Sequence, residues 1–388
     1  MERATVDGIE TLMRRALELA EHGGGATAPN PMVGCVLVAS DGTVIGEGYH
    51  RRAGGPHAEI VALAAAREGG HDPAGSLAVV TLEPCNAHNR TPPCTVALLE
   101  AGVERVAYAV ADPHIGKGGS ERLRAGGVEV AGGLLERSGR RLIEPWLHFV
   151  ESGRPFIHVK TAQTLNARVT RGRESHPWVT GLEARQAVHR LRRQYRAVMV
   201  GVGTVIADDP LLTVRDWPIA EEADGWPEVQ PIRVVLDSRL RTPLESRLVS
   251  SVAAGPVWIF ASTDAPAERE ASLAERGVEV IRVERGREGV DLEAVAEELA
   301  RREVPGLLVE TGPTLATALL EADLVHRWTM FLAPDWVTAK GALPMLLTES
   351  PYMGFELAGA EWSVHGRDAA VTGRVRRATT PASLGLRA

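Results

Sequence analysis

The chain has 388 residues, and at roughly 150 residues per domain this length favours two domains. Hydrophobic residues make up 44% of it and charged residues 24%, as is ordinary for a soluble globular protein, and the net charge of −7 argues against a protein that coats nucleic acid. Three cysteines are too few for a disulfide scaffold and fit a reducing cytoplasm. Because no apolar run approaches the ~18 residues of a membrane span and the first residues are too polar for a secretory signal, we expect a cytoplasmic protein without a membrane partner.

The first half of the chain alternates between predicted helices and predicted strands. Apolar residues at helical spacing predict an amphipathic helix over the first 22 residues, and the turn at 40–42 predicts a hairpin between two apolar runs. The expected strands are 33–38, 43–49, 77–82 and 105–110, and the expected helices are 57–67 and 95–100. This alternation predicts a three-layer α/β sandwich.

A short breaker segment at 151–155 separates a long helix from a new strand, and we place the domain boundary there. The expected domains are residues 1–151 and 155–388. The second half again alternates, with expected strands at 156–161, 197–200, 232–236, 257–261, 307–310 and 328–332, a loop at 201–204, and helices at 182–195 and 291–302. Residues 216–231, rich in proline and acid, indicate a flexible insertion.

One histidine and two cysteines of the first half form the sharpest chemical pattern. His57, Cys85 and Cys94 are good zinc ligands, and three protein ligands leave a fourth position open for water, as in catalytic zinc sites. Zinc lowers the pKa of a bound water towards neutrality. Glu59 follows His57 at the start of a predicted helix, where it can move protons without binding the metal. This is the logic of zinc deaminases, in which the activated water attacks a ring carbon that bears an amino group.

A structural zinc site is the alternative interpretation of these residues. Such a site requires a fourth ligand, which His88 or Cys35 could supply. The two cysteines are separated by eight residues rather than the two of the commonest deaminase pattern. The glycine–proline turn before His57 and the apolar strand before Cys85 favour the catalytic interpretation.

The spacing of the cysteines carries a resemblance to a known family. Residues 81–94 (TLEPCNAHNRTPPC), 29–34 (PNPMVG) and 55–59 (GPHAE) resemble the deaminase half of the bifunctional riboflavin-biosynthesis deaminase/reductases. Residues 157–162 (IHVKTA), 201–215 (GVGTVIADDPLLTVR) and 310–315 (ETGPTL) resemble the reductase half of the same family. The resemblance covers nearly the whole chain.

The resemblance implies a fold and two reactions. It implies a cytidine-deaminase-like N-terminal domain and a dihydrofolate-reductase-like C-terminal domain. The first removes the ring amino group of a 2,5-diamino-6-ribosylamino-pyrimidinone 5′-phosphate, and the second uses NADPH to reduce the ribosyl chain to ribityl. Reductase domains of this family often assemble into homo-oligomers.

The resemblance also assigns residues, and their chemistry agrees with it. The zinc ligands are His57, Cys85 and Cys94, with Glu59 as the proton shuttle, and the deaminase substrate contacts Asn30, His50 and Arg90. The reductase substrate contacts Lys160, Arg192, Asp208, Leu212, Arg215 and Glu310. Two of these, Arg192 and Arg215, are fork donors suited to a phosphate, and the carboxylates can accept bonds from ribose hydroxyls or a ring amine. The expected cofactor-binding residues are Gly201, Gly203, Thr204, Gly312 and Thr314. The chain lacks a G-x-G-x-x-G fingerprint, which argues against a Rossmann site.

The chain departs from the family pattern near both sites. Ala87 stands where a substrate-contacting histidine is usual, and Asn166 and Ala167 replace an aspartate and a glycine. These changes leave open a related pyrimidine deaminase of another pathway with a weakened or retuned reductase, and a non-catalytic scaffold. Intact His57, Glu59, Cys85 and Cys94 argue against the scaffold. The acidic charge and the 4% aromatic content argue against a nucleic-acid deaminase.

Overall fold

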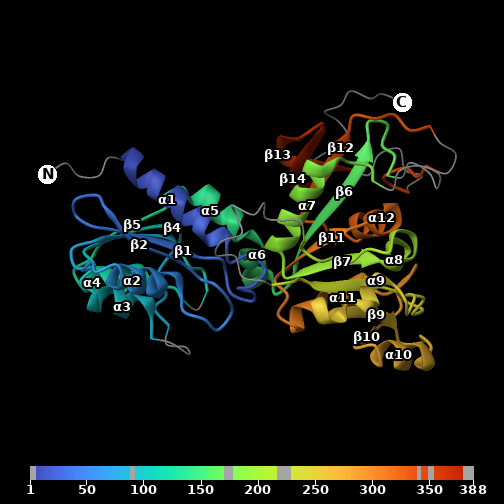
Figure 1. Cartoon of the computed structure of the whole chain (residues 1–388), viewed down its shortest axis with the longest axis horizontal. Coiled ribbons are helices and arrows are strands. Elements are labelled where there is room, and N and C mark those ends of the chain that lie inside the picture. The colour runs from blue at the N-terminus through green and yellow to red at the C-terminus, as the bar shows by residue number, and fades with distance from the viewer. Residues whose placement is uncertain are drawn as a thin grey trace. The chain divides into compact units, whose positions relative to one another are not determined.

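A computed structural model of the chain describes residues 6–87, 92–114, 116–169, 178–215, 229–338, 342–347 and 354–378. The chain divides into two compact units, the first ending at Arg154 and the second beginning at Pro155 (Figure 1). The insertion expected at 216–231 lies almost wholly outside the described residues. No described helix has the length and apolar character needed to cross a membrane.

The first unit is built on a five-stranded sheet in the order β2-β1-β3-β4-β5. β1 pairs antiparallel with β2 and β3, whereas β3, β4 and β5 pair in parallel. Every residue of β1 and β3 is buried, which explains why both read as continuous apolar runs. The strands are β1 (Gly34–Val38), β2 (Val44–Tyr49), β3 (Leu77–Leu82), β4 (Arg105–Val110) and β5 (Glu129–Gly132).

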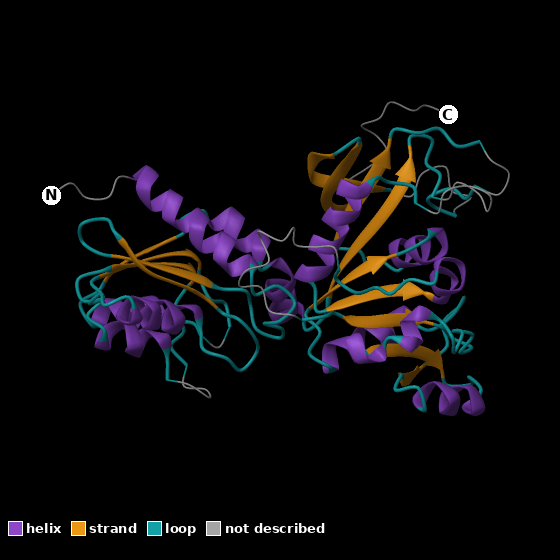
Figure 2. Ribbon diagram, viewed as in Figure 1, coloured by secondary structure: helices purple, strands orange, loops and turns teal. Residues whose placement is uncertain are grey.

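Helices cover both faces of this sheet (Figure 2). Residues of α1 and α6 pack with one set of strand residues, and residues of α2, α3 and α4 pack with the alternate set. The expected three-layer sandwich is therefore confirmed. The helices are α1 (Val6–Glu21), α2 (Ala58–Glu68), α3 (Cys94–Glu100), α4 (Gly119–Ala125), α5 (Glu136–Leu142) and α6 (Glu144–Ser152).

The second unit is built on a nine-stranded sheet in the order β10-β9-β8-β7-β11-β6-β12-β14-β13. All neighbours from β10 to β12 pair in parallel, and the hairpin of β13 and β14 adds an antiparallel edge. The strands are β6 (Phe156–Thr164), β7 (Ala197–Gly201), β8 (Ile232–Leu236), β9 (Val257–Ser262), β10 (Glu279–Val283), β11 (Gly306–Glu310), β12 (Arg327–Ala333), β13 (Phe355–His365) and β14 (Asp368–Arg377).

The order of these strands creates a place for a ligand. From β7 the chain moves outward through β8 and β9 to β10, and it then returns to insert β11 between β7 and β6. In open parallel sheets, ligands bind outside the carboxyl ends of the strands where the direction of winding reverses. The carboxyl ends of β6, β11 and β7 meet at this point.

Helices connect the parallel strands and pack on both faces of the sheet. The loop expected at 201–204 is wrong, because α8 begins at Val202 directly after β7. Its two valines, Val202 and Val205, are buried in the core, which stabilises the turn of helix that the glycines alone do not predict. The helices are α7 (Leu182–Gln194), α8 (Val202–Asp208), α9 (Arg247–Ser250), α10 (Ala267–Ala274), α11 (Leu292–Arg301) and α12 (Pro313–Glu321).

Two candidate active sites

Three side chains of the first unit converge on one point. His57 precedes α2, Cys85 follows β3, and Cys94 begins α3. Their ligand atoms all lie within 4.8 Å of one another, with His57 Nδ1 at 3.5 Å from Cys85 Sγ and 3.3 Å from Cys94 Sγ. One imidazole and two thiolates at these separations suit a tetrahedral zinc ion with one open position.

The electrostatics of Cys85 agree with a metal site, whereas the hydrogen bond with Cys85 and burial raise the pKa of Cys94. Hydrogen bonds with Cys94 and His57 overcome the effect of burial and lower the pKa of Cys85 to about 4. The Cys94 backbone N–H also donates to Cys85 Sγ at 3.3 Å. Cys85 is therefore a thiolate at neutral pH, which is the form that binds a metal.

Glu59 lies beside the cluster in the first turn of α2. The side chain is 3% exposed, and its carboxyl interacts with His57 and with both cysteines. Burial raises the pKa of Glu59, while the charge of His57 opposes the shift. A buried carboxyl with a raised pKa, next to the metal ligands, is suited to accept a proton and to return it.

The fourth ligand considered for a structural site is not Cys35. Cys35 is fully buried in β1 and is not part of the metal-ligating group that the described residues form. His88, the other residue considered, lies outside the described residues.

The cluster has polar neighbours that the sequence predicts. His50 is buried, and its ring centroid lies 5.4 Å from that of His57. His50 Nδ1 donates to the Pro56 carbonyl at 3.0 Å, and burial lowers the pKa of His50, so the neutral ring can accept from Asn30 Nδ2 at 3.4 Å. Asn30 and His50 therefore lie together at the cluster. Arg90, the third expected contact, lies outside the described residues.

Sequence reasoning missed one pair of residues near the cysteines. Arg122 Nη1 on α4 donates to Asn86 Oδ1 at 3.2 Å, and Asn86 directly follows Cys85. The position of Asn86 was a signal for its proximity to the site, but its partner lies 36 residues away and follows no motif.

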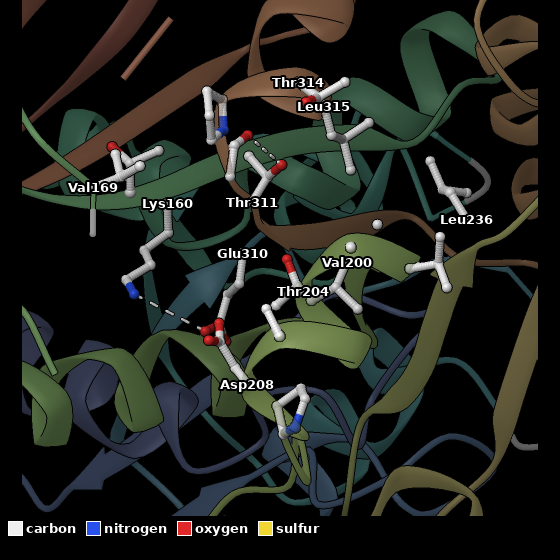
Figure 3. A pocket seen from close by; sticks show the side chains of 18 of the residues that line it. Lys160, Val169, Val200, Thr204, Asp208, Leu236, Glu310, Thr311, Thr314 and Leu315 are labelled. Carbon is white, nitrogen blue, oxygen red and sulfur yellow. Dashed lines mark hydrogen bonds and ion pairs between the residues drawn. The ribbon is translucent and has the colours of Figure 1, made fainter. Parts of the chain in front are cut away.

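The second unit contains a cleft of about 1440 Å³ at the carboxyl ends of its parallel strands (Figure 3). All of the residues expected to contact the reductase substrate or the cofactor line this cleft: Lys160, Arg192, Gly201, Gly203, Thr204, Asp208, Leu212, Arg215, Glu310, Gly312 and Thr314. They come from segments that are up to about 150 residues apart in sequence, and the strand order brings them together.

A charged triad forms the floor of the cleft. The carboxylate of Glu310 accepts from Arg192 Nε at 2.5 Å and from Nη2 at 3.1 Å, and Lys160 Nζ lies 4.0 Å from Glu310 Oε2. Figure 3 shows Lys160 and Glu310 extending toward each other. β6 and β11 are parallel neighbours with Lys160 and Glu310 in register, which positions this pair.

The triad holds Glu310 in its charged form. Burial would raise the pKa of Glu310, but Arg192 and Lys160 outweigh it and hold the pKa at about 2. Burial also lowers the pKa of Lys160. Arg192 is only 8% exposed, and its Nη1 donates to the Thr213 carbonyl at 2.8 Å. The fork expected to bind a phosphate is thus directed at Glu310 and at a loop carbonyl.

Two other expected residues have distinctive environments. Burial raises the pKa of Asp208, which lies at the end of α8. Leu212 is 2% exposed and has a φ of 56°, a left-handed backbone that non-glycine residues rarely adopt. Burial of the leucine side chain in the core offsets the conformational free energy that this backbone costs.

The cleft also has lining residues that sequence reasoning missed: Arg185, Ser238, Arg241 and Arg287. Arg185 stacks over the Trp178 ring at 5.3 Å. A signal for Ser238 was present, because it follows the predicted strand 232–236 just as Thr311 follows the strand that ends at Glu310. The remaining residues follow no motif and enter the cleft only through the tertiary fold.

Comparisons with known proteins agree with both sites. Residues 7–110 match the family model of the cytidine and deoxycytidylate deaminase zinc-binding region, and residues 155–353 match that of the RibD C-terminal domain. The chain is 39% identical over 359 residues to the riboflavin biosynthesis protein RibD of Escherichia coli, covering 89% of this chain and 95% of that one. It is 40% identical over 325 residues to RibD of Aquifex aeolicus, covering 83% and 86%.

Solved structures show the same likeness over nearly the whole chain. Acinetobacter baumannii RibD superposes with a TM-score of 0.79 at 32% identity, covering 96% of this chain and 100% of that one. A diaminohydroxyphosphoribosylaminopyrimidine deaminase/5-amino-6-(5-phosphoribosylamino)uracil reductase of Thermotoga maritima gives a TM-score of 0.78 at 32% identity, covering 95% and 99%. The deaminase and reductase domains imply zinc and a nicotinamide cofactor, and the main interpretation of the sequence is favoured over a retuned relative. The chain belongs to the RibD family and is a bifunctional deaminase and reductase of riboflavin biosynthesis.

Proposed function

We propose that the enzyme deaminates 2,5-diamino-6-(5-phosphoribosylamino)pyrimidin-4-one and then reduces the ribosyl chain of the product to ribityl with NADPH. The deaminase activity is proposed because one imidazole and two thiols converge within 4.8 Å beside a buried carboxyl. The order of the two reactions follows the name of the Thermotoga maritima relative, which gives the deaminase first and the reductase second. We assign the deaminase to residues 1–151 and the reductase to 155–388, which the division of the compact units at Arg154 supports.

In the deaminase, His57, Cys85 and Cys94 would hold zinc, which would supply the positive charge that makes a water molecule nucleophilic at neutral pH. Glu59, whose pKa is raised by burial beside the metal ligands, would take a proton from the attacking water and deliver it to the departing amino group. Asn30 and His50, adjacent to the cluster, orient the pyrimidine, and Arg90 binds its phosphate.

In the reductase, the nicotinamide supplies the hydride, and the chain positions both ligands. The cleft of about 1440 Å³ exceeds the usual ~300–1,000 Å³ of a pocket for one small ligand, which supports joint binding of cofactor and substrate. We assign Gly201, Gly203, Thr204, Gly312 and Thr314 to the cofactor. Gly312 precedes α12, whose backbone N–H groups can receive a phosphate.

The substrate contacts of the reductase are Lys160, Asp208, Leu212, Arg215 and Glu310, with Arg192 holding Glu310. Lys160 is the cation of the triad that lies farthest from Glu310, at 4.0 Å, whereas Arg192 is bound to Glu310 at 2.5 Å. Lys160 is therefore the group that we assign to the sugar hydroxyls, and Arg215 the group that we assign to the phosphate. The three free cysteines fit a reducing cytoplasm, where we place the enzyme.

One incubation tests both halves of the proposal. The zinc-loaded full chain is incubated with the pyrimidine phosphate, with and without NADPH, and the products are identified by mass spectrometry. We expect replacement of an amino group by oxygen without NADPH and the further gain of two hydrogens with it. Deamination that stops at the ribosyl product would contradict the reductase, and no turnover would contradict the substrate.

A further inference from the structure

Two amide side chains of the second unit bind a backbone residue in the same two-point manner. Asn166 Nδ2 donates to the Val337 carbonyl at 2.8 Å, and the Val337 N–H donates to Asn166 Oδ1 at 3.2 Å. Gln230 Nε2 donates to the Val214 carbonyl at 3.0 Å, and the Val214 N–H donates to Gln230 Oε1 at 2.7 Å. Both amides are half-buried. We call these two arrangements the amide clamps.

At neutral pH an amide side chain carries a donor and an acceptor side by side, as a backbone residue does, whereas an ionised carboxylate carries acceptors only. A carboxylate at either position keeps the acceptor but places a second oxygen against a carbonyl oxygen, which is repulsive. Each clamp therefore pairs a loop residue as a neighbouring strand would, in a segment where the sheet ladder does not reach.

The Asn166 clamp connects two segments that line the cleft. Leu165 N–H donates to the Asp335 carbonyl at 3.0 Å, and farther along Val169 N–H donates to the Leu343 carbonyl at 3.0 Å. Val169 and Leu343 both line the cleft, and Figure 3 shows Val169 on the side of Lys160. Asn166 thus fixes the spacing of two segments that together form an apolar part of the wall.

The Gln230 clamp holds the loop that follows α8. Val214 lies between Thr213, whose carbonyl accepts from Arg192, and Arg215, which lines the cleft together with Leu212. The loop is therefore held at Thr213 by Arg192 and at Val214 by Gln230. Loss of either bond would free the segment that carries Leu212 and Arg215.

We propose that Asn166 and Gln230 are positioning residues of the reductase, which hold the two loop walls of the cleft at the spacing that binds the nicotinamide cofactor and the phosphorylated pyrimidine. The inference rests on the proposed function for the identity of these ligands. It gives Asn166, which stands where an aspartate is usual in the family, the role of a clamp in this chain, because an aspartate would lack the amide donor to the Val337 carbonyl.

The test replaces each amide by its isosteric acid in the full chain, as Asn166→Asp and Gln230→Glu. The dissociation constant of NADPH is measured by the quenching of protein fluorescence, and KM and kcat of the reductase are measured separately. We expect each variant to bind NADPH or the pyrimidine about two- to tenfold more weakly near pH 8, the effect of one lost hydrogen bond, with kcat at saturation within about twofold of the wild type.

A pH series separates positioning from a general loss of stability. Lowering the pH from about 8 to about 4.5 protonates roughly a fifth of an introduced aspartate carboxyl and roughly two fifths of a glutamate carboxyl and restores the donor, so the ratio of variant to wild-type dissociation constants should fall. Asn166→Ala and Gln230→Ala, which cannot recover a donor, should show no such fall. Gln194→Glu, at the exposed last residue of α7, is the matched control for added charge and should bind as the wild type does.

Two results would overturn the inference. One is wild-type affinity in all four clamp variants, and the other is a weakening that follows the melting temperature and is the same for acid and alanine at every pH. If the wild-type chain itself does not bind NADPH, the proposed function fails first and the inference with it. Binding by the wild type together with unchanged variants refutes the clamps alone.

Discussion

Glu59 is the residue on which the deaminase chemistry depends most. It is 3% exposed in the first turn of α2, and burial raises its pKa beside His57 and the two cysteines. A carboxylate that is not a metal ligand has no structural reason to be buried there, so its position supports a role in proton transfer.

Glu59→Gln should therefore keep the metal and lose the reaction. The amide has the shape of the carboxyl but cannot carry a proton between water and the amino group, so we expect ammonia release to fall by about 10²–10⁴-fold. Zinc content measured by metal analysis should match the wild type. Near-normal turnover by this variant would contradict the assignment.

Glu310 gives the reductase unit a pH dependence. Its pKa lies at about 2 in the folded chain, below the usual 4.5, because Arg192 and Lys160 outweigh the effect of burial. A carboxyl with a lowered folded pKa stabilises the fold above about pH 4.5, and this stabilisation is lost as the pH falls towards 2.

The free energy of unfolding of the wild type and of Glu310→Gln, measured between about pH 3 and pH 7, tests this dependence. The wild type should be more stable than the variant near neutrality by up to about 3 kcal/mol, and the difference should shrink below about pH 4.5. A difference that does not change with pH would show that the ion pairs of Glu310 contribute no net stability.

At the scale of single elements, the turn after β6 explains one departure from the family pattern. Ala167 has a φ of 56°, and its N–H donates to the Thr164 carbonyl at 2.9 Å, which closes the turn. The side chain is exposed, so the alanine adopts a backbone that a glycine would adopt without strain. The added Cβ at this position is a cost to the turn, and it does not block the cleft.

Ala167→Gly should stabilise the second unit slightly. Relief of the left-handed strain gains about 1–2 kcal/mol, and the greater freedom of glycine in the unfolded chain costs about 0.5–1 kcal/mol. The net gain should raise the melting temperature of this unit by about 1–3 °C in calorimetry. A lower melting temperature would show that the alanine side chain makes a stabilising contact.

The packing of α1 on β1 depends on Gly34. A Cβ at this position would lie 2.0 Å from the Ala16 carbonyl oxygen and 2.9 Å from the Ala20 nitrogen, both backbone atoms that cannot move without displacing the helix. Helix and strand can approach this closely only because the residue has no side chain.

Gly34→Ala should therefore destabilise the deaminase unit by about 1–3 kcal/mol, as overpacking of a core typically does. Chemical denaturation, monitored through the release of bound zinc, measures the midpoint of unfolding of this unit. An unchanged midpoint would mean that α1 can shift away from β1 at little cost.

At the scale of the whole molecule, the two reactions belong to two compact units that are each continuous over their main segments. Each candidate site is built from residues of its own unit: the metal cluster from α2, β3 and α3, and the cleft from β6, β7, β8 and β11. The two chemistries should therefore be separable by mutation.

Lys160→Ala should stop or strongly reduce NADPH oxidation and leave ammonia release within about twofold of the wild type, since only the cleft loses a charge. Asp208→Ala is a second variant with the same expected pattern. NADPH oxidation is followed by absorbance and ammonia by a coupled assay on the same samples. Equal loss of both activities would contradict the independence of the two units.

The sequence by itself predicted the metal cluster, most of the strands and the fold class. His57, Cys85 and Cys94 stand in short motifs whose residue types have few other uses, and parallel strands buried on both faces read as apolar runs. Both signals depend on residue type within short segments, although His57 lies 28 residues before Cys85 and 37 before Cys94 and reaches them only through the fold.

Only the tertiary structure decided which apolar run lies beside which. Strands with similar apolar residues can exchange places without changing the pattern, so the insertion of β11 between β7 and β6 has no local signal. That insertion places Glu310 in register with Lys160 and within reach of Arg192, and it turns an expected phosphate fork into a structural ion pair. The Asn166 clamp also depends on strand pairing, since Asn166 and Val337 are 171 residues apart and meet only when β6 and β12 pair.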